Sequence, residues 1–322
     1  MKPFSMIAVA VLTCAGAYPG ASDVAAQSFP SKPVRLLTTA AGGGLDLASR
    51  IIAQGLAGPL GQPVIVDNRG SIVASEALVK ATPDGYTLLY NANILWLLPF
   101  MRDHVPWDPV RDLSPITLAV SAPNLIVAHP ALPTKTIRDL IVLARLRPGE
   151  LNYASGNAGS SNDLAAELFK SMANIKIVRI GYRGGGPALN DLIGGHLQLS
   201  FSTASAVTSH VKAGKLRALG ITSLQQSALL PDVPTVAAAG LPGYEAVSTQ
   251  GLFAPAGTPN TLLNLLSQEI SRVLARADIR QRFMDAGAQT VGSTPEQFAM
   301  TIKLEMARWG KVIKDAGIRA DD

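Results

Sequence analysis

Cysteine is almost absent from this sequence. Cys14 is the only one among 322 residues, so no intrachain disulfide can form and a zinc site built on several cysteine thiolates is excluded. Because Cys14 lies in an N-terminal segment that we expect to be removed, the mature chain should contain no cysteine. An exported protein without disulfides depends on its core for stability, and a hydrophobic content of 48% is enough for two domains.

Charged and aromatic residues are also few, at 16% and 5% of the chain. The formal charge of +5 suits an anionic small molecule, but the lysines and arginines are scattered and form no basic stripe with interleaved aromatics. A nucleic-acid partner is therefore not expected. No apolar run beyond the N-terminus is long enough to span a bilayer.

Catalytic and metal-binding motifs are missing. The four histidines lie in unrelated segments without the H-E-x-x-H spacing of a zinc site, and the sequence has no G-x-S-x-G elbow of a hydrolase. We therefore expect no metal, no cofactor and no enzymatic activity. One enzymatic alternative stays open: an exported hydrolase that uses Ser160 or Ser161 with a distant histidine as its base.

Residues 1–26 have the pattern of a secretory signal peptide. A positive Lys2 is followed by an apolar core at residues 6–12 and by small residues that precede a cleavage site. We expect cleavage near Ala26 and a periplasmic location. A lipoprotein signal that uses Cys14 is the alternative.

Glycine-rich turns stand out among the features that are present. In residues 34–50 an apolar run ends at glycines 42–44 and a helical pattern begins at once, which predicts a strand, a tight turn and a helix N-terminus. Such a turn lets a ligand approach the backbone, and the unpaired amides and dipole of the helix end favour a carboxylate or phosphate. Residues 151–163 and 177–187 repeat the arrangement. Each could be an ordinary turn without a ligand, but the recurrence favours a site where at least two of them meet.

Strands and helices alternate along the chain, which favours an α/β fold with a largely parallel sheet. A strand at 86–90 leads to Asn91 and Trp96 at the carboxyl edge, where open α/β sheets bind ligands. Trp96 is interpreted either as a wall of the site or as a core residue. A strand at 197–201 delivers Ser202 and Thr203 to a loop. The other expected elements are strands at 63–67, 116–120, 125–129, 216–221 and 251–255, a loop at 69–75, helices at 74–80 and 136–147, a long loop at 231–243, and two closing helices that begin at 258–259 and 294–297.

A series of short motifs follows in order along the chain. They are P-S-K-P-V-R at 30–35, G-G-G-L-D at 42–46, G-Q-P-V at 61–64, D-N-R at 67–69, P-D-G-Y-T at 83–87, W-D-P-V-R-D at 107–112, L-N-Y-A-S at 151–155, G-P-A-L at 186–189, K-L-R-A-L at 215–219, L-P-D-V-P-T-V at 230–236, A-P-A-G-T-P at 254–259 and W-G-K-V-I-K at 309–314. Together they resemble the Bug receptors, the extracytoplasmic solute-binding proteins of the tripartite tricarboxylate transporter family. The resemblance covers essentially the whole mature chain.

The resemblance implies a type II periplasmic-binding-protein fold, in which two α/β lobes close over a small carboxylate. Lobe 1 would consist of residues 27–127 and 250–322, and lobe 2 of residues 128–249. The lobes would move about hinges near Val127 and Gln250.

The resemblance also implies a set of ligand-binding residues. In this family the ligand carboxylate is held by backbone amides of two facing loops, often through bridging waters. The matching residues are Gly43, Gly44 and Asp46 on one side and Ser155, Asn157, Ser160 and Ser161 on the other. Further candidates for the site are Asn91, Trp96, Thr203 and Arg183, the last being the cationic residue beside the third glycine turn.

Two departures from the family pattern concern the far end of the ligand. The loop at 70–74 is shortened and more apolar, and Ser202 stands where many members carry an aspartate. Burying an unpaired ammonium group in such surroundings would be costly. We therefore expect an aromatic or aliphatic carboxylate rather than a zwitterionic amino acid.

The sequence thus predicts a periplasmic receptor that captures a small organic carboxylate and delivers it to membrane transporter subunits. We expect it to be a monomer. Besides the hydrolase named above, a sensor that presents its closed form to a membrane kinase is an alternative.

Overall fold

The computed structural model describes residues 29–155, 159–182, 185–227 and 230–320. The predicted signal peptide and two of the predicted site residues, Asn157 and Arg183, lie outside the described residues. No helix within the described ranges is long and apolar enough to cross a membrane.

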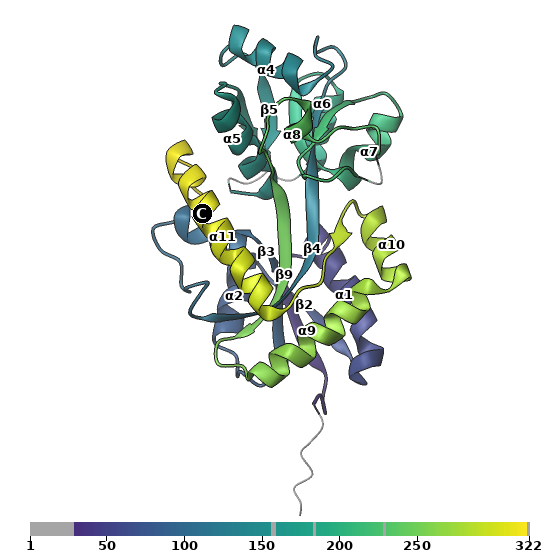
Figure 1. Cartoon of the computed structure of the whole chain (residues 1–322), viewed down its shortest axis with the longest axis vertical. Helices are drawn as coiled ribbons and strands as arrows, with labels where there is room; N and C mark the ends of the chain where they lie inside the picture. The colour runs from purple at the N-terminus through teal and green to yellow at the C-terminus, as the bar shows by residue number, and fades with distance from the viewer. Residues whose placement is uncertain (1–28, 156–158, 183–184, 228–229, 321–322) are drawn as a thin grey trace, which may run out of the picture.

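Two lobes, each a β-sheet covered by helices, make up the fold (Figure 1). The first sheet has the strand order β2-β1-β3-β9-β4. Its elements are β1 (Val34–Thr38), α1 (Gly44–Leu60), β2 (Val64–Asn68), α2 (Ser71–Val79), β3 (Thr87–Ala92), α3 (Ile94–Leu97) and the 3-10 helix η1 (Leu98–Phe100), joined by α9 (Asn260–Ala275), α10 (Ala277–Asp285), β10 (Gln289–Thr290) and α11 (Pro295–Ala316).

The second lobe repeats this plan. Its sheet has the order β6-β5-β7-β4, with β8 on the other side of β4. Its own elements are α4 (Ile137–Leu146), β5 (Asn152–Ser155), α5 (Ser161–Ala173), β6 (Val178–Gly181), α6 (Gly185–Ile193), β7 (Leu199–Thr203), α7 (Ala204–Lys212), β8 (Arg217–Ile221) and α8 (Val236–Ala239). In both lobes three parallel strands are followed by one antiparallel strand.

Two long strands, β4 (Leu113–Ala128) and β9 (Val247–Pro255), run through both lobes. β4 pairs with β9 up to Pro123 and with β7 from Asn124 onward. The strands predicted at 116–120 and 125–129 are therefore one strand, because Pro123 lies where β4 changes partners and does not interrupt a ladder there. The predicted lobe boundaries and hinges at 127 and 250 fall within these two strands and stay predictions.

The directions of the strands turn the carboxyl edges of the two sheets toward each other. β9 enters lobe 1 from lobe 2, and β3 runs antiparallel to it, so β1, β2 and β3 end facing lobe 2. β4 enters lobe 2 from lobe 1, and β7 runs antiparallel to it, so β5, β6 and β7 end facing lobe 1. The turns that follow β1 and β5 thus open into the space between the lobes.

Other local predictions need correction. α2 begins at Ser71, inside the predicted loop at 69–75, because burial of Ala74 and Leu78 against the sheet favours a helix there. The predicted loop at 231–243 contains the short helix α8. Three helices, not two, follow β9 in the described part of the chain, since α10 intervenes. The capping box at the start of α11 and the stop at Gly317 are confirmed.

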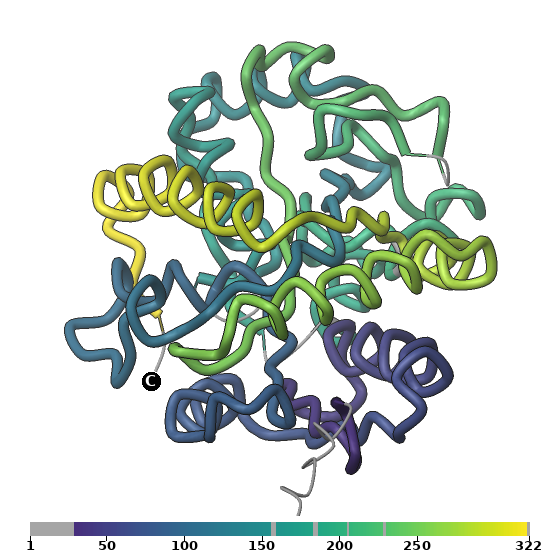
Figure 2. Tube along the Cα trace, turned by 60° about the horizontal axis from the view of Figure 1, so that its bottom comes forward, coloured from purple at the N-terminus to yellow at the C-terminus, as the bar shows by residue number. Residues whose placement is uncertain are grey.

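The helix α11 lies across the junction of the lobes and contacts β4 and α5 (Figure 1). Its buried face belongs to one core cluster that includes residues of both lobes, such as Trp96 and Phe169. The chain after α11 returns to lobe 1, where the Ala320 amide donates to the Met101 carbonyl at 3.2 Å (Figure 2).

Glu305 of α11 forms hydrogen bonds to α3 and to β9, one of the two strands that connect the lobes. The indole Nε1 of Trp96 donates to its Oε2 at 3.0 Å, and the Thr249 hydroxyl of β9 donates to its Oε1. Arg308 forms an ion pair at 3.6 Å with Glu245, just before β9.

We predict that Glu305 gives the stability of the protein a pH dependence. Burial raises the pKa of Glu305 from 4.5 to about 7, although the hydrogen bonds from Thr249 and Trp96 and the charge of Arg308 oppose the rise. Between these two pH values the folded state keeps a proton that the unfolded state has lost, so the free energy of unfolding falls as pH rises through this window.

Glu305→Gln should remove that part of the pH dependence, because an amide can accept from Trp96, donate to Thr249 and carry no charge. At pH 8 the variant should be more stable than the wild type by on the order of 2 kcal/mol, and near pH 4.5 the advantage should vanish. Urea unfolding at four pH values measures both. Parallel stability curves for the two proteins would contradict the prediction.

Candidate functional site

The turn between β1 and α1 is closed by the carboxylate of Asp46. Gly42, with φ of 86°, points its amide at Asp46 Oδ2 at 2.9 Å. Asn68, at the end of β2, donates to Oδ1 at 2.8 Å, and Arg50 pairs with the same oxygen at 2.9 Å. The Gly42 amide, followed by Asn68, lowers the pKa of Asp46 to about 2. Asp46 is 6% exposed, and its carboxylate is held inside the turn.

The turn between β5 and α5 is closed in the same way by Asp163. Gly159, with φ of 77°, donates its amide to Asp163 Oδ2 at 3.0 Å. Ser155, at the end of β5, donates its hydroxyl to Oδ1 at 2.9 Å, and Arg179 pairs with that oxygen at 2.9 Å. Arg179 belongs to β6, the strand with the place in lobe 2 that β2 has in lobe 1. Asp163 is 2% exposed.

Sequence reasoning missed the second of these aspartates and the Arg and Asn partners of the pair, although it named Ser155. The signal was a shared spacing: glycine with positive φ, three residues, then aspartate at the third position of the helix, at 42–46 and again at 159–163. Asn68 and Arg179 carried no local signal, because their role depends on strand neighbours, whereas Arg50 follows Asp46 by four residues on the same helix.

With the aspartates turned inward, backbone amides are the donors at the open ends of these turns. The first amides of a helix have no intrahelical acceptor, and α1 and α2 begin at exposed glycine caps without a side-chain cap bond. In lobe 2 the hydroxyl of Ser160 caps α5 by accepting from the Asp163 amide at 3.4 Å. Thr203 is the N-cap of α7, is exposed, and makes no side-chain cap bond. These helix ends share the two facing carboxyl edges.

Two predicted site residues, Ser155 and Asn91, have side chains that bond within the protein. The Ser155 hydroxyl donates to Asp163, and Ser155 is 2% exposed. Asn91 is fully buried, donates to Ser71 Oγ at 3.2 Å and accepts from the Ala92 amide. Their side chains support the turns rather than face the space between the lobes.

Trp96 is a core residue, so its interpretation as a wall of the site is wrong. It has no exposed surface and packs against Phe253 and Phe298 with ring centroids 5.9 and 5.8 Å away. Its indole nitrogen is bound to Glu305. The reason is that α3 lies against α11, so the Trp96 side chain is buried between α11 and the sheet.

The α5 turn touches lobe 1 directly. A Cβ atom on Gly159 would lie 2.5 Å from the Sδ of Met101 and 3.6 Å from the Cδ1 of Ile94. Met101 has no exposed surface. The absence of a side chain at Gly159 therefore lets the two lobes meet at this point.

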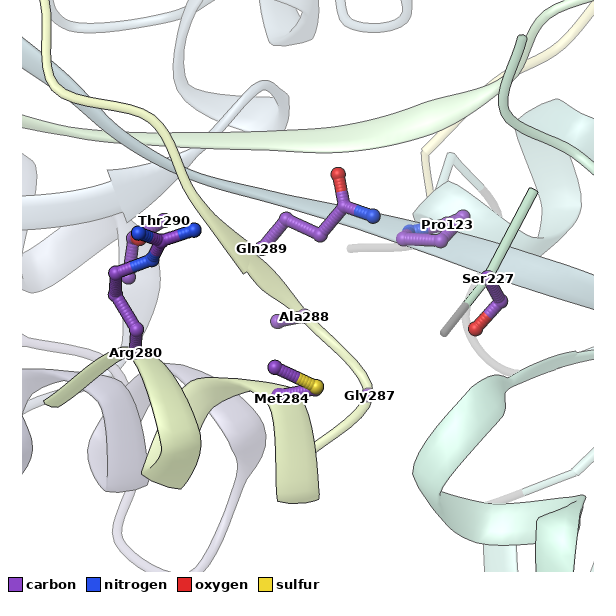
Figure 3. Close-up of a pocket in the computed structure, with 8 residues that line it drawn as sticks. All are labelled: Pro123, Ser227, Arg280, Met284, Gly287, Ala288, Gln289 and Thr290. Carbon is purple, nitrogen blue, oxygen red and sulfur yellow. The ribbon is translucent and has the colours of Figure 1, made fainter. Parts of the chain in front are cut away.

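A hollow of about 330 Å³ lies elsewhere, between α10 and β10 of lobe 1 and the segment of Ser227 in lobe 2 (Figure 3). Arg280, Gln289 and Thr290 line it from the lobe 1 side, and Pro123 lies at its back on β4. None of the predicted site residues within the described ranges lines this hollow, and it is separate from the facing turns.

Metal and nucleophile chemistry find little support among the described residues. They contain no group of three or more His, Cys, Asp or Glu that could hold a metal ion. The Ser160 hydroxyl accepts from the Asp163 amide at 3.4 Å, and the Ser161 hydroxyl donates to Asn162 Oδ1 at 3.3 Å. Neither partner is a base of the kind that activates a serine.

Comparison with known proteins settles the family. The sequence model of the family described as "Tripartite tricarboxylate transporter family receptor" matches residues 48–318 of this chain. Protein BugT of Bordetella pertussis (strain Tohama I) is 33% identical over 309 residues, which cover 93% of this chain and 94% of BugT. The chain belongs to the tripartite tricarboxylate transporter receptor family. The predicted resemblance to the Bug receptors is thereby confirmed.

Solved relatives of this receptor share its two-lobed fold. Rpa4515 of R. palustris, solved with adipate, superimposes with a TM-score of 0.79 at 32% identity, over 90% of this chain and 99% of that one. MatC of Rhodopseudomonas palustris, solved with bound malate, gives 0.73 at 29% identity, over 88% and 100%. The α/β binding-protein fold predicted from the sequence is therefore confirmed.

We predict that Gly159→Ala destabilises the receptor more than Gly149→Ala. Both glycines have positive φ, 77° and 82°, so alanine costs about 1–2 kcal/mol of backbone strain at either position. Only Gly159 is also crowded, because nothing lies within 4 Å of a Cβ at Gly149. Gly159→Ala should therefore lose about 1 kcal/mol more, because the flexible but fully buried Met101 side chain must shift to admit the methyl group.

Denaturant unfolding of the two variants measures this difference. Adding Met101→Ala completes a double-mutant cycle. The combined loss should be smaller than the sum of the single losses, since the truncated side chain leaves room for the new methyl group. Equal losses at the two glycines, or additive losses in the cycle, would show that the lobes do not meet at Gly159 as described.

Proposed function

We propose that this receptor binds a small organic carboxylate on the helix-end amides of the two facing turns and delivers it to the membrane subunits of a tripartite tricarboxylate-type transporter. The observation that carries the proposal is the pair of aspartate-closed turns, one in each lobe, whose remaining amides open into the space between the lobes. Helix N-termini of this kind favour anions through unpaired N–H groups and the helix dipole. Gly43, Gly44 and the backbone of Asp46 would bind from lobe 1.

From lobe 2, the proposed binding residues are Ser160, Ser161 and Thr203, with Asn157 and Arg183 retained from the sequence prediction. Rpa4515 and MatC, solved with adipate and malate, support a carboxylate as the ligand class. BugD, a solved periplasmic binding protein 27% identical to this chain, supports a periplasmic location. We further propose cleavage of the signal peptide near Ala26, a monomeric receptor without enzymatic activity, and lobes that divide at residues 127/128 and 249/250.

The far end of the ligand is proposed to be apolar. Ser202 pairs its hydroxyl with that of Ser200 at 2.7 Å and brings no charge. Val73, near the start of α2, is 54% exposed and offers apolar surface at the lobe 1 edge. An ammonium group would find no carboxylate partner in these residues.

Calorimetric titration with adipate, malate, benzoate, aspartate and glutamate tests this function. We expect at least one of the first three to bind with a micromolar dissociation constant and to raise the melting temperature, because a ligand that binds only the folded state stabilises it. Aspartate and glutamate should bind at least tenfold more weakly. Tight binding of an amino acid alone would overturn the ligand class, and turnover of any of the five compounds would overturn the receptor function.

We predict that neutral donors rather than a cationic side chain hold the carboxylate. Ser160→Ala should weaken binding about tenfold or more, since a hydrogen bond to a charged group contributes about 1.5–3 kcal/mol. Arg183→Ala should have a much smaller effect. The matched control is Thr136→Ala, which removes the hydroxyl N-cap of α4 and should cost similar stability without loss of affinity. Loss of binding in Arg183→Ala with wild-type affinity in Ser160→Ala would reverse the assignment.

A further inference from the structure

The two turns that carry the proposed site are built on one plan. In each, the aspartate at the third helical position accepts the amide of a glycine four residues before it, at 2.9 Å in lobe 1 and 3.0 Å in lobe 2. In each, the other carboxylate oxygen is held by an arginine and by a polar side chain at the end of a strand. The chain thus repeats the same hydrogen-bonded ring at equivalent places of two sheets.

This ring determines which amides remain available. The carboxylate draws the glycine amide inward, and the positive φ of that glycine reverses the chain. The amides that follow then belong to the open first turn of the helix, where no intrahelical acceptor exists. In lobe 1 the Asp46 carboxylate is bonded to Asn68 of the neighbouring strand β2. In lobe 2 the Asp163 carboxylate is bonded to β5, the strand that leads into its turn, and to the neighbouring strand β6. Each turn is therefore fixed to the sheet as well as to the helix.

The ring also settles a problem of charge. A free carboxylate beside an anion site would repel the ligand, but each aspartate is buried and paired with a guanidinium group, at 2.9 Å in both lobes. The negative charge is therefore compensated within the turn. The partial positive charge of the helix end remains to act on the ligand.

We propose that Asp46 and Asp163 are the positioning residues of the ligand site, which hold the two sets of binding amides in place before the carboxylate arrives. The inference rests on the proposed function for its ligand and on the structure alone for the geometry. Neither side chain touches the ligand in this scheme. Preorganised donors bind more tightly because less ordering remains to be done on binding.

The test compares Asp46→Asn and Asp163→Asn with Asp139→Asn. Asn cannot replace Asp in either turn, because every group around the carboxylate is a donor and the amide nitrogen would face one of them. Asp139 occupies the same third position of α4, in a capping box away from the carboxyl edges, so its replacement reports the ordinary helix contribution. Adipate and malate serve as probes in calorimetry, and thermal unfolding is measured in parallel.

The second readout is the amide spectrum of the ligand-free protein. We expect the amide protons of Gly42 and Gly159 to move upfield in Asp46→Asn and Asp163→Asn respectively, while the Trp96 indole resonance stays in place and reports an intact core. Affinity for the probes should fall at least tenfold in both variants and stay unchanged in Asp139→Asn. If Asp163→Asn does not fold, Ser155→Ala, which removes one bond to the same carboxylate, should show a smaller loss in the same direction.

Several results would overturn the proposal. Wild-type affinity in both turn variants, or unshifted glycine amides, would mean that the carboxylates do not set the turns. An equal loss of affinity in Asp139→Asn would reduce the effect to general helix stability. If the wild type binds neither probe, the ligand proposal fails, and the amide shifts of the ligand-free variants still decide whether the aspartates hold the turns.

Discussion

The antiparallel pairing of β4 with β9 is the interaction on which the rest of the structure depends. Each strand begins in one lobe and supplies the antiparallel strand of the sheet in the other, so neither sheet is complete without a strand from its neighbour. The direction of these two strands forces the parallel strands of both lobes to end at the shared boundary. The placement of the turns follows from that constraint, since turns that would otherwise lie at opposite ends of two domains face each other.

Much of this arrangement could be predicted because it is encoded locally. The alternation of strands and helices, the capping box of α11 and the glycine turn before α1 are readable within windows of ten residues, and all are found in the structure. The errors arose where a distant partner decides the outcome. β4 is continuous through Pro123 because β7 takes over from β9 at that point, and α2 starts early because the sheet beneath it buries Ala74. The site followed the same rule: the glycines were visible, while Arg179 could be connected to Asp163 only through the pairing of β5 with β6.

Trp96 and Glu305 show how a residue at the right edge of a sheet can serve the core instead. Trp96 follows β3 within a few residues, which is where ligand contacts are common, yet α3 directs it against α11. There the indole and the Thr249 hydroxyl share one carboxyl group, whose burial raises its pKa to about 7. A carboxyl group so placed binds α11 to lobe 1 and to the crossing strand at once. The C-terminal helix is thereby part of the junction between the lobes and not an appendage of lobe 1.

Under the proposed function, the duplicated turns let a receptor with few charged residues recognise an anion. A site that relied mainly on a lysine or arginine would attract any anion and would need desolvation on binding, whereas backbone amides are fixed donors with little conformational entropy to lose. Backbone amides in glycine-rich turns have the disadvantage that such turns are flexible. An aspartate that accepts a hydrogen bond from the glycine amide restricts that flexibility. The negative charge that this requires is cancelled by Arg50 in one turn and Arg179 in the other. In the proposed site, acidic residues thus stand at the centre without opposing an anion, because their oxygens are bonded within the turns and their charge is balanced where it arises.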